Sequence, residues 1–194
     1  MNSFDEYFGS VNLAAARVNR DSLEQAFKAI DGCARLYIMG NGGSAANADH
    51  WVCDYMKGLN EDTNKHDILT AKAISLASNG PLVTALANDI GYDHIFARQL
   101  SYYRCQHGDV VLAMSASGNS LNILNGIDKA NQLGATTIAL TGFNGGLAST
   151  MSKINVHVPS SNYGVVEDVH MMILHAISQR IRYRDATDRE SLKL

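Results

Sequence analysis

The sequence has few cysteines, no long apolar run and no concentration of basic residues. Its three cysteines, Cys33, Cys53 and Cys105, are an odd number without the spacing of a disulfide framework, so a reduced, cytoplasmic protein is expected. No apolar run approaches the roughly 20 residues of a membrane-spanning helix, and no basic stretch precedes an apolar core as in a signal peptide. Lysine and arginine are scattered singly and the net charge is −3. We therefore expect neither membrane insertion nor binding to nucleic acid.

What the chain does contain is typical of a compact globular protein. Its 194 residues are 46% hydrophobic and 18% charged, which is enough to bury a core and too apolar for a disordered chain. We expect one domain over residues 1–194, with a helical arm at 1–32 and a frayed, charged tail at 184–194.

Short apolar runs alternate with segments of helical periodicity along the chain. The apolar runs predict five strands, near 36–39, 71–76, 110–114, 137–140 and 154–158. The intervening segments predict a polar loop at 59–67 and helices at 44–57, from Asn79, from Asp93 to Tyr102, at 120–132 and from about 165 to 183. Strands that are apolar throughout and alternate with helices are typical of a parallel sheet covered on both faces. We therefore predict an α/β fold.

Two blocks of small residues follow the first and third predicted strands. They read Gly-Asn-Gly-Gly-Ser at 40–44 and Ser-Ala-Ser-Gly-Asn-Ser at 115–120, and each opens a predicted helix. Helix N-termini present unpaired N–H groups and a positive dipole end, so two such turns can hold one phosphorylated ligand from two sides. Ligands of parallel sheets bind beyond the carboxyl ends of the strands, where both blocks fall. The blocks therefore predict a phosphate site.

Two other interpretations of these blocks remain open. Residues 40–45 satisfy the G-x-G-x-x-A form of the dinucleotide fingerprint, although no acidic residue follows the second strand to hold a ribose. Alternatively, the glycines only permit a tight turn and Ser120 only caps a helix. The structural interpretation explains most of the role of Gly40 and Gly43. The three serines around Gly118 favour the interpretation as a phosphate site.

One predicted helix carries a histidine and a carboxylate at helical spacing. His50 and Asp54 are four residues apart, so their side chains project from one face. Such a pair is able to bind a divalent metal or to place a base beside its orienting partner. A surface ion pair is the other interpretation.

The final predicted helix carries a second set of titratable residues, Glu167, Asp168, His170 and His175. By default, His175 is a hydrogen-bonded core histidine, because it lies in an apolar run. At about 100° per residue, Asp168 is nearly in line with His175, whereas Glu167 is roughly 80° away. The angular positions around the helix axis by themselves therefore favour Asp168 as the acidic neighbour of His175.

Five motifs in order along nearly the whole chain resemble the phosphoheptose isomerases, which belong to the sugar isomerase (SIS) domain proteins. The motifs are the sequences at 40–50, 87–92, 115–120, 140–142 and 167–175. The resemblance implies a three-layer fold with a five-stranded parallel sheet of flavodoxin-like order. It also implies a homotetramer with active sites at subunit interfaces. The implied reaction converts sedoheptulose 7-phosphate to D-glycero-D-manno-heptose 7-phosphate for bacterial surface heptose.

The resemblance also implies roles for individual residues. The implied catalytic acid/base pair is Asp54 and His175, and zinc or another divalent metal is implied on His50, Asp54, Glu167 and His175. The implied substrate-binding residues are Asn41, Gly42, Gly43, Ser44, Asn88, Asp89, Ser115, Ala116, Ser117, Ser120 and Glu167.

Two positions depart from the family pattern. Asp54 stands where the family commonly has glutamate, and Glu167 where it commonly has glutamine. The changes shorten one carboxylate arm and add a negative charge, so the isomerase of another phosphosugar is an alternative. A non-enzymatic SIS adaptor that binds a replication initiator protein is a second alternative, but that type of sequence lacks the carboxylate and the second histidine that this chain keeps.

Overall fold

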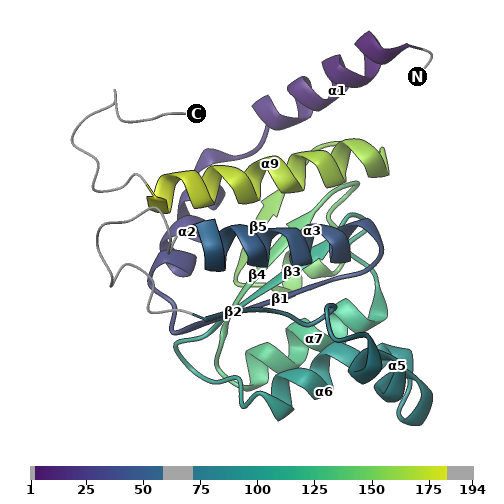
Figure 1. Cartoon of the computed structure of the whole chain (residues 1–194). Coiled ribbons are helices and arrows are strands. Elements are labelled where there is room, and N and C mark those ends of the chain that lie inside the picture. The colour runs from purple at the N-terminus through teal and green to yellow at the C-terminus, as the bar shows by residue number, and fades with distance from the viewer. Residues whose placement is uncertain (1–2, 59–71, 183–194) are drawn as a thin grey trace.

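The computed structural model describes residues 3–58 and 72–182, and its centre is a parallel five-stranded sheet (Figure 1). The strand order is β2-β1-β3-β4-β5. The bounds are β1 (Arg35–Gly40), β2 (Lys72–Ser75), β3 (Val110–Ser115), β4 (Thr136–Thr141) and β5 (Ile154–His157). This is the flavodoxin-like order, and the predicted α/β class and all five strands are confirmed.

Helices cover both faces of the sheet and complete a three-layer arrangement (Figure 1). One face carries α2 (Arg20–Asp31), α3 (Gly43–Cys53) and α9 (Tyr163–Arg182), and α1 (Phe4–Ala16) packs on α9. The other face carries α5 (Gly80–Asp89), α6 (Ile95–Tyr102), α7 (Leu121–Gln132) and the short α8 (Ala148–Met151). The expected helical arm thus consists of two helices.

The central strands β1 and β3 are buried on both sides, which explains their long apolar sequences, whereas the edge strands β2 and β5 are only partly buried. In β1, Leu36 and Ile38 belong to the core under α2, α3 and α9, whereas Tyr37 and Met39 belong to the core under α5, α6 and α7. Alternation along the strand therefore supplies side chains to two cores at once.

Some helix boundaries agree with the sequence prediction and others do not. Asn79 caps α5 as predicted, since its side chain accepts a hydrogen bond from the N–H of Leu82 at 3.1 Å. The predicted start at Asp93 is wrong, because Asp93 lies inside a 3₁₀ turn, η2 (Tyr92–His94), and α6 begins at Ile95. The predicted loop at 59–67 and the tail at 184–194 lie outside the described residues.

The helix after the glycine block changes from α-helix to π-helix at Asp54. The predicted helix at 44–57 is α-helical as α3 and continues as a π-helical segment, η1 (Asp54–Gly58). Segments of π-helix are rare in proteins, and those that occur are often found at functional sites.

The sheet order places both small-residue blocks at one edge. The chain crosses to opposite faces after β1 and after β3, so a crevice opens beyond the carboxyl ends of these two adjacent strands. The glycine turn follows β1 and the serine turn follows β3. In the described part of the chain, no helix combines the length and apolar character needed to cross a membrane.

Candidate active site

The glycine turn brings the start of α3 close to the end of β1. Gly42 adopts φ +54° at the N-cap of α3 and provides no side-chain cap. A Cβ on Gly40 would lie 2.6 Å from the carbonyl oxygen of Ser44, and a Cβ on Gly43 would collide with the carboxylate of Glu167. The structural interpretation therefore holds for Gly40, because its Cβ would collide with backbone atoms. At Gly43 the neighbour is the end of a flexible side chain, and the carboxylate of Glu167 lies against the first turn of α3, where an anion would bind.

The two turns line one cavity of about 130 Å³. Its lining residues are Asn41, Ser44, Met114, Ser115, Ala116, Ser117, Ser120, Tyr163 and Glu167. The cavity thus joins the end of β1, the start of α3, the serine turn and the start of α9. It is a small, hydroxyl-rich hollow at the switch point of the sheet.

The serine hydroxyls of this cavity keep their capacity to donate hydrogen bonds. The oxygen of Ser115 accepts from the N–H of Gly118 at 3.1 Å, and that of Ser117 accepts from the N–H of Asn119 at 3.3 Å. Each of these hydroxyls uses its oxygen as an acceptor and retains its proton for a ligand. Ser120 occupies the N-cap position of α7, but its side chain makes no capping hydrogen bond. Helix capping therefore does not explain this serine.

Glu167, and not Asp168, faces the cavity. Asp168 instead accepts a hydrogen bond from the hydroxyl of Tyr7 on α1 at 2.7 Å. The preference for Asp168 from helix facing is therefore wrong. Loss of solvent and, secondarily, the negative charge of Asp168 raise the pKa of Glu167. The hydrogen bond between Tyr7 and Asp168 raises the pKa of Tyr7 to about 12.

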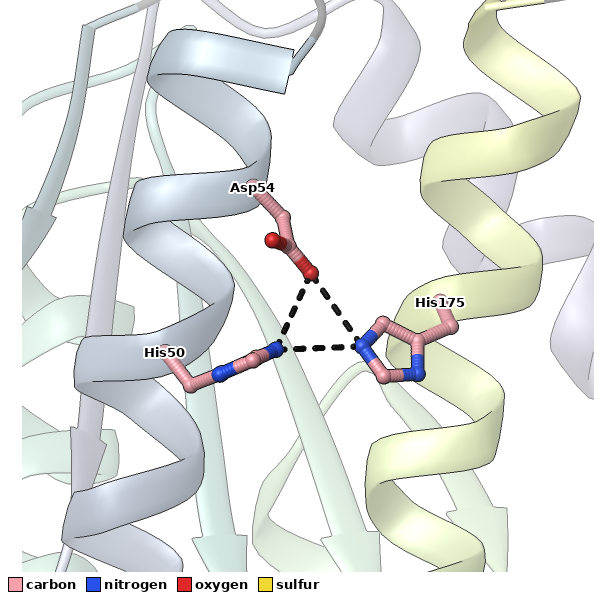
Figure 2. A group of neighbouring side chains, drawn as sticks. All are labelled: His50, Asp54 and His175. Carbon is pink, nitrogen blue, oxygen red and sulfur yellow. Dashed lines mark hydrogen bonds and ion pairs between the residues drawn. The ribbon is translucent and has the colours of Figure 1, made fainter.

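A second group of side chains lies on the same two helices (Figure 2). Asp54 Oδ2 is 3.3 Å from His50 Nε2 and 3.1 Å from His175 Nε2, and the two imidazole nitrogens are 3.2 Å apart. His50 and Asp54 come from α3 and its π-helical continuation, and His175 comes from α9. The three polar atoms point toward one another and form a nearly equilateral triangle.

Hydrogen bonds between α3 and α9 hold these side chains in register. The fully buried Trp51 donates its indole N–H to the carbonyl oxygen of Leu174 at 2.9 Å and to the hydroxyl of Ser178 at 2.8 Å. Asn47 donates to the carbonyl oxygen of Glu167 at 2.9 Å. Trp51 follows His50 directly and Leu174 precedes His175, so these bonds set the spacing between the two histidines.

The core histidine of α9 is His170 and not His175. The side chain of His175 is 48% exposed, so the expectation of a core histidine is wrong for this residue. His170 is the core histidine: its Nε2 lies 3.3 Å from the carbonyl oxygen of Thr141, and its Nδ1 has no partner among the described residues. Burial, the main cause, lowers the pKa of His170 to about 4.

The triangle of His50, Asp54 and His175 has the donor chemistry of a divalent-metal site. Their ligand atoms all lie within 4.8 Å of one another. Ligand atoms about 2.0–2.1 Å from a tetrahedral zinc ion are about 3.3 Å apart, which matches the observed spacing of 3.1–3.3 Å. Two histidines and one carboxylate leave a fourth position open, as in catalytic zinc sites. Glu167, the fourth ligand implied by the resemblance, is not in this group and lines the serine cavity instead.

The metal-type triangle and the serine cavity lie along the same pair of helices. Ser44 in the cavity and His50 in the triangle are six residues apart on α3, a rise of about 9 Å. Glu167 and His175 are similarly separated by two turns on α9. The two groups are therefore about two helical turns apart along the same pair of helices.

Asn88 and Asp89 lie apart from this cavity. They end α5 and are exposed, and the amide of Asn88 donates to the carboxylate of Asp89 at 2.8 Å. Neither residue lines the serine cavity within this chain.

Three residues near the cavity were missed by sequence reasoning. Tyr163 lines it and packs against Phe143, with ring centroids 4.7 Å apart and the ring planes tilted by 55°. Asn122 and Tyr92 hydrogen-bond to Asn41, which also lines it. An amide two residues after Ser120, in the first turn of the helix, was the available signal for Asn122. Tyr92 is the last residue of the motif at 87–92, whereas nothing local distinguishes Tyr163.

The chain is similar in sequence and fold to known proteins. The model of the SIS domain family matches residues 6–142. The phosphoheptose isomerase of Mycobacterium bovis is 37% identical over 173 residues, which cover 89% of this chain and 84% of that protein. The solved phosphoheptose isomerase from Francisella tularensis superposes with a TM-score of 0.82 at 29% identity and covers 94% of this chain and 99% of that chain. The one from Neisseria gonorrhoeae gives a TM-score of 0.81 at 28% identity, with 92% and 94% covered. The chain therefore belongs to the SIS domain family and, within it, to the phosphoheptose isomerases, which are enzymes.

Proposed function

We propose that this enzyme converts sedoheptulose 7-phosphate to D-glycero-D-manno-heptose 7-phosphate through an enediolate, in the cytoplasm, for bacterial surface heptose. The observation that carries the proposal is the 3.1 Å approach of Asp54 to His175 on the helices that also border the serine cavity. A carboxylate and an imidazole at this distance can divide the proton transfers of an aldose–ketose isomerisation.

In the proposed binding mode, the phosphate occupies the cavity between the two turns. Ser115, Ser117 and Ser120 donate their hydroxyl protons to it, and the N-terminus of α3 adds the positive end of its dipole. Binding of this remote group fixes the reacting end of the sugar, so part of the phosphate binding energy lowers the barrier of the chemical step.

In the proposed mechanism, Asp54 moves the proton between the two reacting carbons. It removes the proton from C1 of the ketose and returns it to C2, while His175 moves the proton between the oxygens on the same carbons. Both groups are partly exposed, as a substrate-accessible acid and base must be.

The donor set of the triangle fits zinc, and we propose that His50, Asp54 and His175 hold it. When bound, zinc supplies Lewis-acid stabilisation of the negative oxygen that develops during the reaction. Glu167 is the candidate for a fourth ligand, and reaching the triangle requires its side chain to leave the serine cavity.

We further propose a homotetramer with active sites at subunit interfaces. The exposure of Asn88 and Asp89 at the end of α5 supports this arrangement, because the sugar-binding role implied for them is not met by the cavity of their own chain. Exposed apolar side chains on α1, Phe4 and Phe8, offer a surface for such contacts.

A panel of C5 to C7 ketose phosphates, assayed with metal-stripped and zinc-reconstituted protein, tests the proposal. The seven-carbon substrate should give the highest kcat/KM, and Asp54→Asn and His175→Gln should each lower kcat by about 10²–10⁴-fold. Asp49→Asn, an exposed carboxylate on the same helix, is the matched control and should leave kcat within twofold. Activity of either site variant within a few-fold of the parent would contradict the assigned roles.

A different phosphosugar is the second candidate substrate. Glu167 favours it, because a carboxylate in the serine cavity changes the charge that meets the ligand. A five- or six-carbon ketose phosphate with the highest kcat/KM in the same panel would select this candidate.

A further inference from the structure

A reciprocal pair of carboxamides connects the two turns of the cavity. Asn41, directly after β1, donates its amide to Asn122 Oδ1 at 2.9 Å, and Asn122 donates its own amide to Asn41 Oδ1 at 2.9 Å. Asn122 lies in the first turn of α7, directly after the serine turn. The two residues are 81 positions apart in sequence, so only the fold brings them together.

The orientation of this pair is defined by neighbouring groups. The backbone N–H of Ile123 donates to Asn122 Oδ1 at 3.0 Å, which requires the oxygen of that carboxamide on this side. The hydroxyl of Tyr92, in η2, donates to Asn41 Oδ1 at 2.9 Å. Each amide oxygen thus accepts two hydrogen bonds, and the network also ties in the segment that follows α5.

Counting donors and acceptors shows what remains for a ligand. The carboxamide of Asn41 has two acceptor positions and two N–H donors. Both acceptor positions are occupied by Asn122 and Tyr92, and one N–H is bonded to Asn122. Within the part of the chain that the structure describes, the second N–H is uncommitted, and Asn41 lines the serine cavity. The network therefore makes Asn41 a donor with a defined orientation.

We propose that Asn122 is a positioning residue for the sugar phosphate: its amide pair with Asn41 joins the glycine turn to the serine turn and presents one N–H of Asn41 to an oxygen of the bound ligand. Asn122 is 2% exposed and does not line the cavity itself, so it acts through Asn41. The identity of the ligand rests on the proposed function, whereas the amide pair is seen in the structure itself.

The distinguishing variant is Asn122→Asp, because it preserves the size and shape of the side chain. It keeps the acceptor for Ile123 and removes the donor to Asn41 Oδ1, so two oxygens then face each other and Asn41 turns or moves. The matched control is Asn125→Asp, one turn further along α7. That side chain donates to the carbonyl oxygen of Asp93 at 2.8 Å and does not contact Asn41.

Steady-state kinetics with the best ketose phosphate of the panel provide the first readout. Asn122→Asp should raise KM by about tenfold with kcat within threefold, since the loss falls on binding of the ligand. Asn125→Asp should leave both constants within twofold. Tyr92→Phe, which removes one hydroxyl from an exposed side chain, should raise KM by about two- to threefold. An unchanged KM in Asn122→Asp, or a fall in kcat alone, overturns the proposal.

A second readout does not depend on turnover. In NMR spectra of ¹⁵N-labelled protein, the Asn41 carboxamide resonances should shift in Asn122→Asp and remain in place in Asn125→Asp. If the wild-type enzyme turns over none of the ketose phosphates, the proposed function fails. The amide pair is then judged by these resonances and by their response to added inorganic phosphate. Identical Asn41 resonances in the two variants, or no response of Asn41 to phosphate, overturn the inference.

Discussion

Replacing Trp51 by phenylalanine tests whether its hydrogen bonds to α9 maintain the distance between Asp54 and His175. The indole N–H of Trp51 is shared between Leu174 and Ser178 of α9, next to His175. Trp51→Phe keeps an aromatic ring but removes both hydrogen bonds and part of the packing. About 1 kcal/mol for each lost hydrogen bond, with a comparable cost for the void, predicts a loss of about 2–4 kcal/mol in the free energy of unfolding. For a chain of this size, each 1 kcal/mol lowers the Tm by about 2–4 °C.

The same change should impair catalysis beyond its effect on stability. Without these bonds α3 is free to shift against α9, and the 3.1 Å between Asp54 and His175 no longer holds. A displacement of about 1 Å at reacting groups costs up to about 100-fold in rate, so kcat should fall by at least tenfold at temperatures where the variant is folded.

Two further variants separate the causes. Ser178→Ala removes one of the two acceptors and keeps the only tryptophan of the chain, so its fluorescence reports both unfolding and the changed indole environment. It should cost about 1 kcal/mol. Tyr37→Phe, in the opposite core, loses a hydroxyl bond to the carbonyl oxygen of Tyr103 and should lower the Tm without lowering kcat. Circular dichroism melts and kcat measured on the same samples decide the matter. A Trp51→Phe enzyme with parental Tm and kcat would refute the role of this contact.

Three other expectations follow from individual side chains. His170 is neutral in the folded protein with a pKa of about 4, whereas the unfolded chain takes up this proton near 6.5, so its contribution to stability is complete above pH 6.5 and is lost as the pH falls toward 4. The difference amounts to about 3 kcal/mol. The difference in free energy of unfolding between wild type and His170→Gln should therefore become smaller as the pH is lowered through this range. A difference that does not change with pH in urea titrations would contradict the assignment. The raised pKa of Glu167 makes its charged form unfavourable, so Glu167→Gln should raise the Tm of metal-stripped protein at pH 7, with the advantage vanishing below pH 4.5. Equal gains at both pH values would exclude this cause. Ser120→Ala should raise KM for the sugar phosphate but leave the Tm unchanged, because this hydroxyl caps no helix. A lower Tm with an unchanged KM would indicate a structural serine.

Local sequence patterns were sufficient for the architecture and for part of the site. Apolar runs of strand length marked all five strands, because a sheet that is buried on both faces needs apolar side chains at nearly every position. The two small-residue turns predicted the shared cavity, since parallel strands place their carboxyl ends at one edge. The spacing of His50 and Asp54 placed both on one helix face because helical geometry is local.

Which side chains face one another was decided by the packing of distant elements. The apolar neighbours of His175 suggested burial, but α9 turns that residue toward α3 and buries His170 against β4 instead. Helix facing could not choose between Glu167 and Asp168, because the choice depends on where α1 and the glycine turn lie around α9.

Composition, element order and the spacing of residues within one helix or turn were determined by the sequence itself, since they depend on neighbours within a few positions. The triangle of His50, Asp54 and His175 and the amide pair of Asn41 with Asn122 were decided only by the tertiary structure. Each depends on distances between side chains from segments that are far apart in sequence, and no local pattern contains that information.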